Sequence, residues 1–155
     1  MAACDAGQAA TPPISPGTSH APRDVNIIAR DYSFQPDVVT FVPGETVLLH
    51  VINGGLEVHE AILGDQSVQD AWEAAEAKVA GAPPGPTPVV SVPPDVAGIR
   101  IVVASGQRVD LLWNVPIRAG VPGAPPWIVG CHIPGHWDKG MHVPVQWVFP
   151  SPKAT

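Results

Sequence analysis

The sequence predicts an all-β fold, a sandwich or barrel of about eight strands with one short helix inserted. Hydrophobic residues make up 45% of the 155 residues and charged residues only 14%, which suits one domain with a well-filled core. The 20 prolines and 15 glycines argue against an α-rich fold, because proline is excluded from helix interiors and central strands. We therefore expect a single β domain with many loops.

The N-terminal part of the chain differs in composition from the rest. Residues 1–23 are rich in Ala, Pro, Gly, Ser and Thr and have few apolar anchors, as flexible tethers do. We therefore divide the chain into a tether, residues 1–23, and one folded domain, residues 24–155. The start, MAACDAG, lacks the basic and apolar regions of a signal peptide and is typical of a trimmed mature form. Small residues precede Cys4, so both a membrane tether through a lipid on Cys4 and an ordinary tail cysteine remain open.

The first half of the domain contains several runs that predict strands. The strongest is TVLLHVIN, residues 46–53, which ends at a turn cluster of Asn and two Gly. Residues 31–36 alternate aromatic and polar side chains before a proline. The remaining runs of this half are VNIIAR at 25–30, VVTFV at 38–42 and VHEAIL at 58–63.

One segment breaks the β pattern. In SVQDAWEAAEAKVA, residues 67–80, apolar residues recur at steps of three and four, which predicts an amphipathic helix. Ser67 and Asp70 have the spacing of a capping box at its start. The proline-rich GAPPGPTP that follows cannot continue a helix.

The second half of the domain returns to strands. The runs are IRIVVA at 99–104, RVDLLWNV at 108–115, WIVGC at 127–131 and VPVQWVF at 143–149. With the earlier runs, they bring the total to about eight strands.

One loop spaces three candidate metal ligands regularly. It reads CHIPGHWDKGM, so that four residues separate Cys131 from His136 and four more separate His136 from Met141. Each residue alone also fits a structural role, and only the joint spacing favours a metal. Thiolate, two imidazoles and a weakly bound thioether form the ligand set of blue-copper centres, because sulfur and imidazole suit copper in both oxidation states. With His59 as the second imidazole, the sequence predicts one copper ion that cycles between Cu(I) and Cu(II).

The segments VINGGLEVHE and CHIPGHWDKGM together resemble those of the cupredoxins, the small blue-copper fold, over about residues 25–149. The resemblance implies a Greek-key β-sandwich or barrel, with His59, Cys131 and His136 as equatorial ligands and Met141 as the axial ligand. The four-residue gaps resemble those of rusticyanin and sulfocyanin and of the type 1 site in multicopper oxidases. The family also implies electron passage through the edge of His136, with an apolar surround of Ile133, Pro134 and Trp137.

The sequence lacks residues that catalytic copper sites need. Multicopper oxidases and nitrite reductases carry a histidine immediately before the ligand cysteine, whereas this chain has Gly130. The sequence contains no His-x-His pair, and a binuclear centre would need a second cysteine on the loop. His132 is expected to point away from the metal by strand alternation, and the role of His142 stays open. We therefore predict no enzyme activity and no catalytic residues, although zinc could also occupy the site.

The residue after the first histidine departs from the family. Many cupredoxins carry Asn or Ser there, but this chain has Glu60, whose ionised side chain cannot donate a hydrogen bond. The backbone N–H of Glu60 can still reach the Cys131 sulfur, and such contacts tune a bound metal.

The predicted function is the transfer of single electrons between redox partners outside the cytoplasm, such as a c-type cytochrome or a terminal oxidase. We expect a periplasmic or extracytoplasmic, membrane-associated protein. The alternative is an extracytoplasmic copper carrier, although carriers favour open sites rich in Met or His and this chain has 2 Met. A net charge of -6 with only 8 Lys and Arg argues against nucleic acid as a partner. No apolar run approaches the roughly 18 residues of a transmembrane helix.

Overall fold

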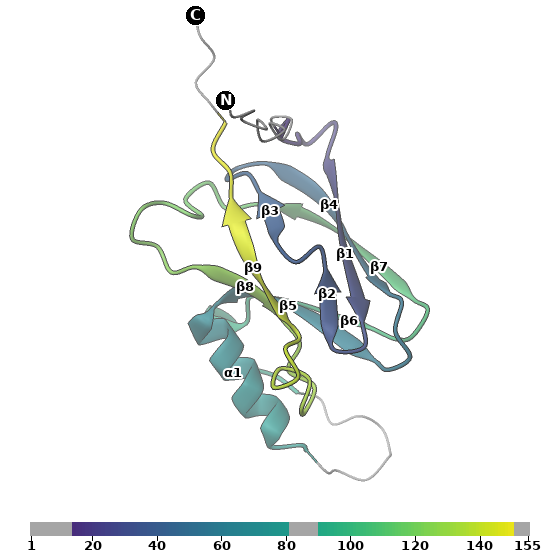
Figure 1. The fold of residues 1–155 in the computed structure, drawn as a ribbon. Coiled ribbons are helices and arrows are strands. Elements are labelled where there is room, and N and C mark those ends of the chain that lie inside the picture. Colours follow the sequence, from purple (N-terminus) through teal and green to yellow (C-terminus); the bar gives the residue numbers. More distant parts are fainter. Residues whose placement is uncertain (1–13, 81–89, 151–155) are drawn as a thin grey trace, which may run out of the picture.

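The computed structural model describes residues 14–80 and 90–150 and is a sandwich of two β-sheets, with helix α1 (Gln66–Ala77) packed against β5 and β8 (Figure 1). The first sheet has the order β2-β1-β4-β7 and comprises β1 (Arg23–Arg30), β2 (Ser33–Gln35), β4 (Thr46–Asn53) and β7 (Arg108–Asn114). The second has the order β3-β9-β8-β5-β6 and comprises β3 (Val39–Phe41), β5 (His59–Asp65), β6 (Ile99–Val103), β8 (Trp127–Gly130) and β9 (His142–Trp147).

The strand pairing mixes neighbours that are close and distant in sequence. The pairs β1–β4 and β3–β9 are parallel, and the other pairs are antiparallel. The first strand thus pairs with a strand that follows two others, as in a Greek key. The predicted all-β class, with its Greek-key sandwich and inserted helix, is confirmed.

The core lies between the two sheets and extends to the loop after β8. Along β1, Val25, Ile27 and Ala29 are buried and alternate with more exposed residues, as expected for a strand with one face on the core. Cys131 and Met141 belong to the same buried cluster. The candidate metal ligands are therefore part of the core and not an addition to its surface.

The helix begins differently from the prediction. Its N-cap is Asp65, whose side chain accepts from the backbone N–H of Val68 at 3.2 Å. Ser67 donates its hydroxyl to Asp65 at 2.5 Å, and Asp70 accepts from the Gln66 amide at 2.8 Å. The predicted capping box of Ser67 and Asp70 is wrong, because β5 runs directly into the helix and its last residue already caps it.

Part of the predicted tether contacts the domain. Residues 1–13, with Cys4, lie outside the described residues. Gly17 is buried; its N–H donates to Glu45 Oε2 at 3.2 Å, and its carbonyl accepts from the N–H of Thr46 at 3.0 Å. Arg23 opens β1 and binds both carboxylate oxygens of Glu45, at 2.8 and 2.6 Å. The division at residue 23 stays a prediction. Across the described residues, none of the helices is long and apolar enough to cross a membrane.

A charged cluster also occupies the first sheet. His50 on β4 is buried, with Nδ1 at 2.6 Å from Asp110 Oδ1 and Nε2 at 2.9 Å from Asp24 Oδ1. Arg108 binds the same Asp110 carboxylate through two nitrogens. The hydrogen bonds to Asp110 and then to Asp24 raise the pKa of His50 against the effect of burial.

Replacing Arg23 by methionine is expected to destabilise the fold. Burial raises the pKa of Glu45, but hydrogen bonds from Arg23 and from the backbone of Val42 and Gly17 lower it overall, so the carboxylate is held charged in the core. Arg23→Met leaves that charge without its cation, at a cost of about 3 kcal/mol of unfolding free energy. Denaturant unfolding measures the loss, with the exposed Arg30→Met as control. Equal stability of the two variants would contradict this role.

The stability that His50 contributes is expected to depend on pH. Because the pKa of His50 is raised in the folded state, its contribution to the free energy of unfolding is fully present below the unfolded-state pKa of about 6.5. This contribution is lost as the pH rises through the folded-state pKa. The difference in unfolding free energy between the parent and His50→Gln should therefore be largest in mild acid and shrink in mild alkali. A difference that does not change with pH would show that His50 is neutral between its two aspartates.

Candidate metal centre

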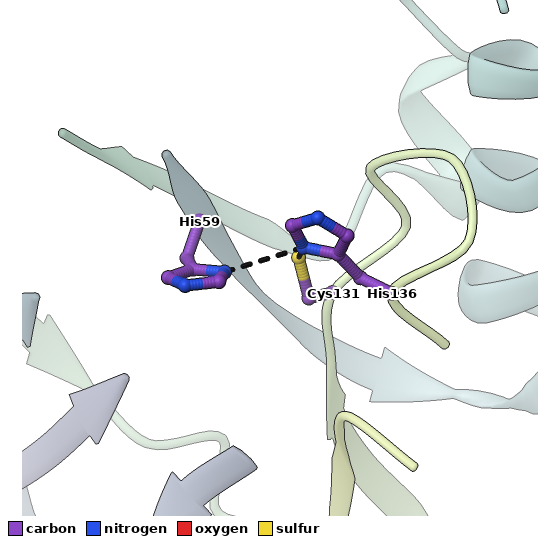
Figure 2. Close-up of side chains that lie close together, drawn as sticks. All are labelled: His59, Cys131 and His136. Atoms are coloured by element: carbon purple, nitrogen blue, oxygen red, sulfur yellow. Dashed lines mark hydrogen bonds between the residues drawn. The ribbon is translucent and has the colours of Figure 1, made fainter. Parts of the chain in front are cut away.

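Three side chains from two strand ends and one loop meet at the end of the core (Figure 2). His59 begins β5, Cys131 directly follows β8, and His136 lies in the loop before β9. His59 Nδ1 and His136 Nδ1 are 3.2 Å apart, and Cys131 Sγ lies 3.4 Å from His136 Nδ1. The three ligand atoms lie within 4.8 Å of one another, and all three residues are buried. The structure thus brings together three of the four predicted ligands by their side chains.

The fourth predicted ligand, Met141, is held beside them by the backbone of the loop. Its carbonyl accepts from the N–H of Cys131 at 3.1 Å, and its own N–H donates to the carbonyl of His136 at 3.2 Å. Gly135 and Gly140 have positive φ values of 86° and 93°, which let the loop fold back on itself. The Met141 side chain is fully buried in the core. Its role as axial ligand stays a prediction.

The thiol of Cys131 is held in a dry environment. Burial raises its pKa to about 12, although the backbone N–H groups of Glu60 and Ile133 act in the opposite direction. The hydrogen bond expected from the Glu60 N–H to the sulfur stays a prediction. A metal that binds here must displace the thiol proton, because the thiolate is the ligand form.

The far nitrogens of both imidazoles face carboxylates. His59 Nε2 lies 3.0 Å from Asp31 Oδ1, and His136 Nε2 lies 3.0 Å from Glu57 Oε2. Hydrogen bonding to His59 and to the backbone of Leu56 and Glu57 lowers the pKa of Asp31. Hydrogen bonding to Tyr32 and to His136 lowers the pKa of Glu57. Burial, with repulsion from His59, lowers the pKa of His136.

This arrangement suits a soft metal. An ionised carboxylate only accepts hydrogen bonds, so each Nε2 must carry the proton that it shares with its carboxylate. In a neutral ring the proton on Nε2 leaves Nδ1 with a free lone pair. Two such lone pairs then face each other and the sulfur inside the core. Two nitrogens and one sulfur at this spacing fit copper or zinc, and the thioether of Met141, the fourth predicted ligand, would favour copper.

The residues that follow the four predicted ligands line the other side of the site. Glu60 accepts from the backbone N–H of His132 at 3.0 Å. The rings of His132 and Trp137 stack with centroids 4.7 Å apart, and those of Trp137 and His142 with centroids 4.4 Å apart. His132 therefore points away from the ligand atoms, as predicted, and His142 ends a stack of three rings.

Helix α1 fixes two of these residues, Glu60 and His132, which we call the outer row of the site. Gln69 and Glu73 contact the two ring nitrogens of His132 at 2.7 and 2.6 Å. Arg100 bridges Glu60 and Glu76 at 2.8 and 3.0 Å. Burial raises the pKa of Glu60, with Arg100 acting against it. The inserted helix thus fixes residues directly next to two of the ligands.

The sequence missed Asp31, Tyr32 and Glu57. Glu57 stands two residues before His59, and this spacing alone predicts no contact with His136. Asp31 lies 28 residues from its histidine, and only the packing of two loops brings them together. His136 is the most exposed of the four predicted ligands, at 4% against 0% for the other three, and Glu57 faces its Nε2.

Comparisons with known proteins identify the fold. No protein-family model matches the chain, and no curated protein does either. Among solved structures, a dithionite-reduced auracyanin from the photosynthetic bacterium Roseiflexus castenholzii is 16% identical with a TM-score of 0.61, covering 85% of this chain and 99% of that one. Auracyanin A, a "blue" copper protein of Chloroflexus aurantiacus, is 19% identical with a TM-score of 0.60, covering 83% and 100%.

A further similar structure is an azurin from Methylomonas sp. strain J, at 15% identity and a TM-score of 0.53, covering 83% of this chain and 99% of that one. The chain has the cupredoxin fold, as the sequence predicted.

Proposed function

We propose that the protein is a mononuclear type 1 copper protein that carries single electrons. The observation that carries the proposal is the buried group of His59 Nδ1, His136 Nδ1 and Cys131 Sγ, with Met141 bonded through its backbone to the same loop. The similar "blue" copper protein of Chloroflexus supports the same metal. Copper bound by these four residues would supply a one-electron couple.

The residues of the chain have separate tasks in this function. Cys131, His59 and His136 would hold the copper through one sulfur and two nitrogens, and Met141 would supply a fourth, weaker thioether ligand. The outer row of Glu60 and His132, fixed by helix α1, and the two carboxylates on the imidazoles keep the ligands in place. A site held rigid in this way changes little between the two oxidation states, which favours rapid transfer. It needs no catalytic residues, and we propose no enzyme activity.

We further propose that the protein works outside the cytoplasm, in the periplasm or at a membrane surface, between partners such as a c-type cytochrome and a terminal oxidase. The acidic net charge of -6 supports a partner with a basic contact surface. A copper carrier is the competing function. The burial of all four predicted ligands argues for retention of the metal over its release.

Copper(II)-loaded protein is expected to absorb strongly in the visible, because the Cys131 thiolate transfers charge to the metal, and ascorbate should bleach the band. Cys131→Ser should abolish the colour. The exposed Ser105→Cys variant, combined with Cys131→Ser, is the control for a thiol elsewhere. A visible band that survives in Cys131→Ser would refute the ligand assignment.

The protein is expected to exchange electrons rapidly and to keep its copper, which would distinguish an electron carrier from a copper carrier. Stopped-flow mixing of the copper protein with a small c-type cytochrome or an inorganic redox reagent measures the rate of electron exchange. Transfer of copper to a chelator measures the release of the metal. Slow electron exchange together with ready release of copper would favour the carrier.

A further inference from the structure

We propose that the turn formed by Asp31 and Tyr32, between β1 and β2, positions both imidazoles of the metal centre. The inference deepens the proposed copper function and rests on it. Neither residue is a predicted ligand. Asp31 acts directly on His59, and Tyr32 acts on His136 through Glu57.

Asp31 joins one imidazole to the loop of residues 54–58. Its Oδ1 lies 3.0 Å from His59 Nε2 and accepts the backbone N–H of Leu56 at 3.0 Å and of Glu57 at 3.2 Å. Oδ2 accepts from Leu56 at 3.1 Å. The carboxylate that orients His59 therefore also fixes the backbone of Glu57, which orients the other imidazole.

Tyr32 completes the contact with His136 in two ways. Its hydroxyl donates to Glu57 Oε1 at 2.7 Å, while Glu57 Oε2 lies 3.0 Å from His136 Nε2. Its ring packs edge-on against the His136 ring, with centroids 5.2 Å apart and an interplanar angle of 82°. Lys139 Nζ lies over the Tyr32 ring, 3.8 Å from the ring centroid.

The backbone at Tyr32 supplies an independent observation. Tyr32 has a φ of +68°, and it is the one non-glycine residue with positive φ in the described part of the chain. Bulky residues rarely adopt this conformation, and where it persists the surrounding contacts hold it. Here those contacts include Glu57 and the His136 ring.

Gly55 is required by the same contact. A Cβ at Gly55 would lie 2.4 Å from Asp31 Oδ1 and 2.8 Å from the Asp31 nitrogen, so any larger residue displaces Asp31. A Cβ at the neighbouring Gly54 would meet its nearest atoms at 3.9 Å, an ordinary contact. The chain thus offers a matched pair of positions, one that disturbs Asp31 and one that does not.

The chemical effect has two parts. A carboxylate on Nε2 keeps the proton on that nitrogen and directs the Nδ1 lone pair to the metal, and such contacts commonly change metal affinity 10-fold to 100-fold, on the order seen at other sites. The two negative charges also favour copper(II) over copper(I). Orientation and charge can be separated, since asparagine keeps an accepting oxygen but carries no charge.

The first experiment follows the tautomer in full-length, metal-free protein by heteronuclear NMR at about pH 8, where an unperturbed imidazole is neutral. In the parent and in Asp31→Asn, the His59 proton should reside on Nε2, and in Asp31→Ala it should be shared between both nitrogens. Glu57→Ala should change His136 and leave His59 as it is. Asp37→Ala, at another exposed aspartate, should change neither.

The second experiment uses the copper-loaded protein. Asp31→Ala should bind copper(II) about 10-fold more weakly or worse. A 10-fold loss for copper(II) relative to copper(I) raises the one-electron reduction potential by about 59 mV. Asp31→Asn should raise the potential while it keeps the parent tautomer. Gly55→Ala should follow Asp31→Ala, and Gly54→Ala should follow the parent.

The outcomes distinguish this inference from the proposed function. Parent-like tautomer, copper affinity and potential in Asp31→Ala would overturn the positioning role, even if the variant melts at a lower temperature. A parent protein that binds no copper would overturn the proposed function. In that case the NMR comparison in metal-free protein still decides whether Asp31 and Glu57 orient the imidazoles.

Discussion

The close approach of two imidazole nitrogens in the core imposes the main constraint on this structure. His59 Nδ1 and His136 Nδ1 are 3.2 Å apart, the Cys131 sulfur lies beside them, and all three residues are buried. Lone pairs at this distance repel unless a cation or a proton lies between them. The surrounding contacts hold the donors in place from two sides, so a cluster that could hold a metal ion is built into the fold.

One side of the site is polar and the other is aromatic. On the first side, Asp31 and Glu57 bind the far edges of the imidazoles from loops between strands. On the second, the ring stack that begins at His132 is anchored by helix α1, a segment inserted after β5. The ligand loop therefore lies between a charged support and a helical one. The helical support acts through residues next to the ligands in sequence, whereas Asp31 reaches His59 from 28 residues away.

The sequence predicted the fold, and it predicted three residues that the structure brings together, His59, Cys131 and His136, for identifiable reasons. Strands such as Thr46–Asn53 have strong β-branched and apolar patterns that end at turn residues, and the spacing of Cys131, His136 and Met141 is local. The helix start was missed because Asp65 serves both as the strand end and as the cap. The contacts of Asp31 and Tyr32 could not be predicted, since they depend on how two loops pack and on an unusual backbone conformation at Tyr32.

The sharing of one Asp31 oxygen between His59 and the backbone of residues 56 and 57 bears on protein engineering. Blue-copper loops are attractive pieces for transplantation, because three of the four proposed ligands lie within the eleven residues 131–141. In this protein a graft of that loop would carry three of the proposed ligands, without His59 and without the groups that orient the two histidines. A faithful transplant needs three separate segments: the loop itself, residues 54–59, and the turn at residues 31 and 32. Most of the proposed ligands thus lie in one loop, whereas the groups that orient them come from separate segments of the chain.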